Sequence, residues 1–107
     1  MAEDGEAARL GSTLEELAQL LAQVGENGWA ARLRQTRARI TRGDGGGFAE
    51  VVSLIGGPGD GGLNDLVIHP LHGHQVDEED LDEVNQRLGL LTTTAFRLAR
   101  RLVRQQD

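Results

Sequence analysis

The chain of 107 residues contains no cysteine, and none of its eleven basic residues is a lysine. Without cysteine there can be no disulfide, no thiolate metal ligand and no cysteine nucleophile. Without lysine there can be no P-loop, whose signature requires a lysine before serine or threonine. No run of about 18 apolar residues occurs, which excludes a typical membrane-spanning helix. Fold and function must therefore be sought in helical patterning, glycine and charge.

The charges are unevenly distributed along a chain of net charge −6. Residues 44–83 contain ten acidic residues and no basic one, whereas the arginines concentrate in residues 29–43 and 84–107. An acidic chain is a poor general ligand for nucleic acid, because such affinity comes from neutralising phosphates. The acidic first six residues lack the basic and then apolar pattern of a secretory signal. We therefore expect a cytoplasmic protein that binds neither nucleic acid nor membrane.

Apolar residues recur at steps of three and four over the first half of the chain, which predicts helices. We expect a flexible N-terminus over residues 1–11 and a single helical domain over residues 12–107. Ser12 or Thr13 should cap the first helix, since each has a glutamate three residues later. Gly25 should end it. A second helix over residues 28–41, capped by Asn27, and a short third helix over residues 48–55 should follow.

The last helix has the most regular pattern. Asp77 can cap it, and its apolar positions repeat at steps of three and four through Leu81, Val84, Leu88, Leu91, Ala95, Leu98 and Leu102. Gly89 predicts a bend or the close approach of another helix, because glycine forms helices poorly.

The predicted fold is all-α. It is a small bundle of about four helices, with a glycine-rich loop and a short extended segment before a long C-terminal helix.

Five glycines and one proline fall within residues 56–62, so this segment cannot be helical. Such a loop can bind anions through its backbone N–H groups. However, neither a P-loop nor a dinucleotide fingerprint is present, and Asp60 places a negative charge where a phosphate would lie. We therefore interpret the segment as a structured turn that requires positive φ angles. Asn64 and Asp65 follow it, and they either fix the turn through backbone bonds or present their side chains to a partner.

His69, His72 and His74, with Asp77 nearby, are residue types that bind zinc. Their spacing matches no standard site, and we expect solvated loop histidines with no metal and no cofactor. No serine–histidine–carboxylate set can be assigned either, and so we expect no enzymatic activity. A small ligand- or metal-binding domain that uses the glycine loop and these three histidines remains an alternative.

An acidic cluster at the start of the last helix forms either a solvated helix start or a docking face for a basic partner. With the glycine loop it gives the predicted partner-binding residues, which are Asp60, Asn64, Asp65, Asp77, Glu78, Asp80 and Asp82.

The chain also resembles a family of small uncharacterised bacterial proteins. The likeness covers residues 27–105 and lies in Trp29-Ala30, the glycine run from Gly56 and, most specifically, Asn64-Asp65-Leu66-Val67. Pro58 replaces the methionine usual in that family, and the residues 60–62 replace a single serine. The resemblance implies an immunity protein, that is, the companion of a secreted toxin, and it carries over no catalytic residue.

These observations predict a non-enzymatic interaction protein of the immunity type, which binds and neutralises a cognate bacterial toxin domain. A homodimeric regulatory helical bundle is a further alternative.

Overall fold

The computed structural model describes residues 5–106, and within them the secondary structure is entirely helical. The four α-helices are α1 (Glu6–Gln23), α2 (Asn27–Thr41), α3 (Gly46–Ile55) and α4 (Leu81–Gln105). Three short 3₁₀ turns, η2 (Leu63–Asp65), η3 (Pro70–His72) and η4 (Glu78–Asp80), lie between α3 and α4. The predicted all-α bundle with a long C-terminal helix is confirmed.

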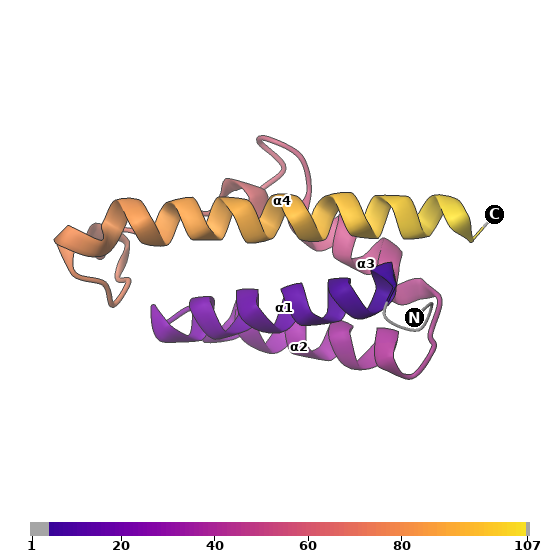
Figure 1. The fold of residues 1–107 in the computed structure, drawn as a ribbon. Helices are drawn as coiled ribbons and strands as arrows, with labels where there is room; N and C mark the ends of the chain where they lie inside the picture. The colour runs from indigo at the N-terminus through magenta and orange to yellow at the C-terminus, as the bar shows by residue number, and fades with distance from the viewer. Residues whose placement is uncertain (1–4, 107) are drawn as a thin grey trace.

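Helix α1 is the central element because it packs against both α2 and α4. The short helix α3 packs on α2 and α4 and so joins the two sides of the bundle (Figure 1). The leucines of α1 at three- and four-residue steps are fully buried, including Leu10, Leu14, Leu17 and Leu21. Leu88, Ala95, Leu98 and Leu102 form the facing stripe of α4. The leucine rows of the sequence therefore meet in one core.

The first helix begins earlier than predicted. Its N-cap is Gly5, and the Thr13 hydroxyl lies inside the helix, where it donates a hydrogen bond of 2.8 Å to the carbonyl oxygen of Arg9. Burial explains the early start, since Leu10 is fully buried and must be helical to join the stripe. The predicted capping by Ser12 or Thr13 is wrong, and the boundary predicted at residue 12 falls inside α1. Residues 1–4 of the predicted flexible terminus lie outside the described residues.

Two glycines end α1 and α2 by the same geometry. Gly25 and Gly43 have φ angles of +93° and +82°, which glycine adopts without strain. After α1, the amide of Glu26 donates to the carbonyl of Leu21 at 2.8 Å and that of Gly25 donates to Ala22 at 3.1 Å. This pair of bonds is a Schellman motif. Asn27 is the first residue of α2 and makes no side-chain cap bond, so its predicted capping role is wrong.

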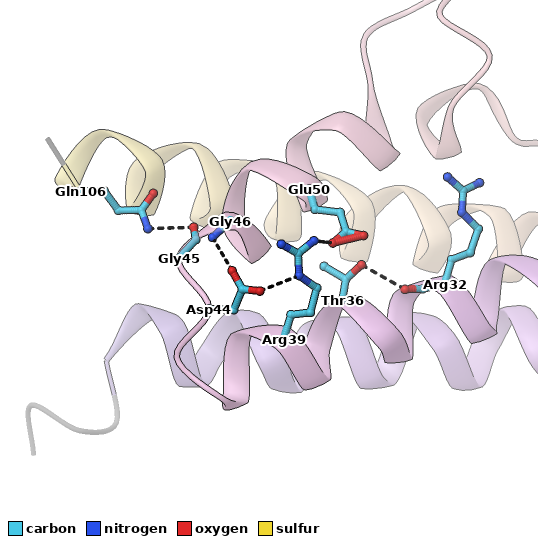
Figure 2. A network of polar contacts seen from close by, with 8 residues as sticks. All are labelled: Arg32, Thr36, Arg39, Asp44, Gly45, Gly46, Glu50 and Gln106. Carbon is cyan, nitrogen blue, oxygen red and sulfur yellow. Dashed lines mark hydrogen bonds and ion pairs between the residues drawn. The ribbon is translucent and has the colours of Figure 1, made fainter.

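A polar network fixes the junction between α2 and α3 (Figure 2). Arg39 donates through Nε to Asp44 at 3.0 Å and through Nη1 to Glu50. The other oxygen of Asp44 accepts from the amide of Gly46 at 3.0 Å, and the Arg39 guanidinium lowers the pKa of this carboxyl. The side chain of Gln106 donates to the carbonyl of Gly45 at 2.9 Å, which ties the end of α4 to the same turn.

Helix α4 is a single helix through Gly89. A Cβ atom at Gly89 would have no non-local atom within 4 Å, so no helix of the described chain approaches it. The close approach predicted there is wrong, because Gly89 faces solvent. Among the described residues, no helix is both long and apolar enough to cross a lipid bilayer.

Candidate functional site

The glycine loop is held by two carboxylates, Asp60 within the loop and Asp65 in the turn η2 that follows it. Asp65 accepts from the amide of Gly59 at 2.9 Å and, through its second oxygen, from the amide of Gly61 at 2.7 Å. Asp60 accepts from the amide of Gly57 at 2.7 Å. The bonds from Gly59 and then Gly61 lower the pKa of Asp65, because they stabilise its ionised form. The amides of Gly57, Gly59 and Gly61, which could have bound an anion, are therefore occupied by these two carboxylates.

The end of the loop approaches α3 too closely for a side chain. A Cβ atom at Gly62 would lie 2.7 Å from the carbonyl oxygens of both Leu54 and Ile55. The next residue, Leu63, is buried and packs into the core. Asn64 is exposed, and its side chain makes no hydrogen bond with the other residues that the structure describes. Asp65 therefore fixes the loop, whereas the loop presents the amide of Asn64 to solvent.

The segment Leu66–Ile68 lies in no helix or strand, is extended at Leu66, and is held by Asn85 of α4. The Asn85 side chain accepts from the amide of Ile68 and donates to its carbonyl, both at 2.9 Å. It also donates to the carbonyl of Leu81 at 3.0 Å. Asn85 was not among the residues predicted from the sequence to have a role. The available signal was a polar residue directly beside the apolar stripe of α4, which is a position that needs a polar partner.

The histidine segment is more ordered than expected. The side chain of His74 is 5% exposed, and its Nε2 lies 2.7 Å from a carboxylate oxygen of Glu26. Its Nδ1 accepts from the amide of His69 at 3.0 Å. The amide of Gln75 donates to the carbonyl of Val24 at 3.0 Å, so the segment is fastened to the turn between α1 and α2. The prediction of a solvated loop histidine is wrong for His74.

The other two histidines also bond to the backbone. His69 Nδ1 accepts from the amide of Leu71 at 3.0 Å, and His72 Nδ1 lies 3.3 Å from the carbonyl of Val67. The ring centroid of His72 lies 6.0 Å from that of His69 and 6.1 Å from that of His74. Across the described part of the chain, no three histidine or carboxylate side chains are placed to hold one metal ion.

A groove of about 600 Å³ lies between the end of α1 and the start of α4. Its apolar lining comes from Leu20, Val24, Val76 and Val84. Three carboxylates, those of Asp77, Asp80 and Glu83, stand around it together with Gln23, Gln75 and Arg87. Arg87 lies 4.0 Å from Glu16 of α1. The groove therefore combines an apolar floor with a mainly acidic rim.

The acidic cluster beside this groove consists of Asp77, Glu78, Glu79, Asp80, Asp82 and Glu83. All six are exposed, and none forms an ion pair with another described residue. Asp77 is the N-cap of the turn η4 rather than of an α-helix, and Asp80 is the N-cap of α4. Neither makes a side-chain cap bond, so their carboxylates are available to a partner.

The structure does not join the two halves of the predicted partner-binding surface. The glycine loop with Asp60, Asn64 and Asp65 stands beside the middle of α4, whereas residues 77–82 lie at its N-terminal end (Figure 1). The segment Leu66–Ile68 and the histidine segment separate them along the chain. The groove lies at the acidic end only.

The sequence profile of the domain of unknown function DUF6966 matches residues 22–77, which is more than half of the chain. The chain belongs to the DUF6966 family. The DUF6966 match contains α2, α3, the glycine loop and the histidine segment, and it ends where α4 is about to begin. The match therefore supports the predicted resemblance to an uncharacterised family. It covers residues 22–77, a shorter span than the residues 27–105 over which the sequence resemblance was stated. No curated protein and no solved structure matches the chain.

Proposed function

We propose that the chain is a non-enzymatic interaction protein of the immunity type, which binds and neutralises a bacterial toxin domain in the cytoplasm. The observation that carries the proposal is the acidic groove: an apolar floor lies beside six exposed carboxylates that make no ion pair within residues 5–106. Charges left unpaired on one face attract a partner of opposite charge. The small size and the resemblance to toxin companions agree with this role.

The groove favours a basic partner segment that also carries apolar side chains. The apolar lining from Val24, Val76 and Val84 would bury such side chains, while Asp77 and Asp80 would face lysine or arginine at the rim. Rim charges mainly raise the association rate, and salt screens their effect. A toxin domain that acts on nucleic acid has a surface of this kind, since it must bind phosphates.

The test uses a candidate cognate toxin domain and compares the wild-type chain with a variant that carries Asp80→Asn and Asp82→Asn. Asparagine keeps the size of aspartate and its capping preference, so the fold should be retained. We expect the association rate to fall roughly tenfold at low salt, with a much smaller effect at about 0.5 M salt. Protection of cells that express the toxin should fall in parallel.

The matched control carries Gln35→Arg and Ser53→Arg, which change the net charge by the same amount at exposed sites on α2 and α3. It should bind and protect like the wild type. If both variants lost binding and protection equally, the effect would be due to net charge alone. Unchanged association kinetics in the asparagine variant would refute a role of the acidic surface in toxin binding. Native mass spectrometry showing stoichiometric zinc would instead favour the ligand- or metal-binding alternative.

A further inference from the structure

The exposed face of α4 carries charges of opposite sign in its two halves. Glu83 lies in the first half and Arg97 in the second, and both are exposed. Between them the face is uncharged apart from Arg87 at its edge, and it centres on Leu90, which is 70% exposed. Within residues 5–106, no opposite charge lies within 4.0 Å of Glu83 or Arg97.

This arrangement goes beyond what the helix dipole favours. The dipole stabilises acidic groups in the first turn and basic groups in the last turn, and its effect fades within that turn. Glu83 fits this rule, but Arg97 lies about two turns before α4 ends at Gln105. Leu90 stands exposed at the centre of this face, where packing against a partner would remove its apolar surface from water.

The charges are placed symmetrically about Leu90. Glu83 and Arg97 each lie seven residues from it, which is about two helical turns in either direction. If a second copy packs antiparallel with its two-fold axis beside Leu90, Glu83 of one copy faces Arg97 of the other, and the same pair forms again across the axis. A two-fold interface requires self-complementarity of this kind. The two exposed leucines then cover each other at the centre.

We propose that α4 mediates an antiparallel homodimer, in which Leu90 packs against its copy between two Glu83–Arg97 ion pairs. We infer that the partner is a second copy of the chain. The acidic half of α4 in one copy is complementary in charge to the basic half of α4 in the other copy. This proposal rests on different residues from the toxin proposal except for Glu83, which also stands at the groove, so a second copy and a bound toxin would compete for this carboxylate. Exposed ion pairs are weak and screened by salt, so the dimer should form at high protein concentration and low salt.

The test is sedimentation equilibrium of the full chain at about 50 mM salt, with Glu83→Arg and Arg97→Glu as single variants. Each single variant should weaken dimerisation roughly tenfold or more, because it replaces two attractive pairs by two repulsive ones. The double variant should dimerise like the wild type. An equimolar mixture of the two single variants should also form dimers, since each of the two charge pairs across the axis then again joins one arginine and one glutamate.

Arg42→Glu is the matched control, because it reverses an exposed arginine on another face. It should leave the dimerisation constant within about twofold of the wild-type value. Circular dichroism of all variants checks that the helices remain folded. A wild-type chain that stays monomeric at about 0.5 mM would overturn the proposal. Single variants that dimerise like the wild type, or a mixture that does not recover dimers, would overturn the antiparallel register.

Discussion

Gly62 and Gly89 show how differently one residue type can act in the same chain. Gly62 sits against the backbone of α3, where a Cβ atom would overlap two carbonyl oxygens, whereas Gly89 faces open solvent within α4. Because backbone atoms cannot move aside as easily as the end of a flexible side chain, the alanine substitution should be harmful at the first position only.

We predict that Gly62→Ala lowers the free energy of unfolding by about 1–3 kcal/mol, the cost typical of overpacking. Gly89→Ala should raise it by up to about 1 kcal/mol, because alanine is the better helix former. Urea denaturation of both variants measures the two values. Equal effects of the same sign would show that the close contact between Gly62 and α3 is absent.

The Asp65 carboxylate makes the glycine loop sensitive to acid. Its pKa in the folded state lies below the unfolded value of about 3.9, because the amides of Gly59 and Gly61 bond to the ionised form. The stabilisation is therefore complete at neutral pH and is lost as the pH falls below about 4 and through the folded-state pKa. The loop should remain formed throughout the physiological range.

We predict that the amide proton shifts of Gly59 and Gly61 titrate together, with a midpoint below the unfolded value of about 3.9. Asp65→Asn should abolish this titration and speed the exchange of at least one of the two amides, because asparagine offers a single acceptor oxygen for two donors. NMR over the acidic range provides the measurement. A wild-type midpoint above the unfolded value would contradict the bonding of Asp65.

At the scale of elements, the sequence predicted helices well and their connections poorly. The leucine stripes of α1 and α4 and the glycine end of α1 at Gly25 are local signals, because periodicity and a preference for positive φ can be read from neighbouring residues. The start of α1 at Glu6 was missed because a burial requirement at Leu10 outweighed the capping pattern at Ser12 and Thr13.

The connections depend on partners distant in sequence. His74 bonds to Glu26 from 48 residues away, and Asn85 holds Ile68 from 17 residues away. No local pattern distinguishes a buried histidine from a solvated one, or a clamping asparagine from a surface one. For the same reason the sequence predicted the acidic end of the site but not the groove, which needs α1 and α4 to be placed side by side.

The bond between His74 and Glu26 fastens the histidine segment to the turn that follows α1, next to the groove. The amide of Gln75 bonds to the carbonyl of Val24. We predict that His74→Ala speeds hydrogen exchange of this amide by roughly tenfold or more, because an unpaired buried group costs about 1–3 kcal/mol. His72→Ala is the control, since His72 is exposed. Similar exchange at Gln75 in both variants would rule out this role of His74.

At the scale of the whole molecule, the described residues measure 43 × 29 × 20 Å, and α4 spans the long dimension (Figure 1). The two ends of α4 carry charges of opposite sign. The acidic end carries the groove, and the DUF6966 match stops at the start of this end.

Hydrogen exchange of the chain, measured free and bound to a candidate cognate toxin domain, tests the central claim most directly. The account predicts that binding protects backbone amides in residues 20–24 and 75–87, which line the groove. Residues 97–104 at the arginine-rich end of α4 should exchange at unchanged rates. Protection of residues 97–104, with unchanged exchange rates in the groove residues, would contradict the proposed function.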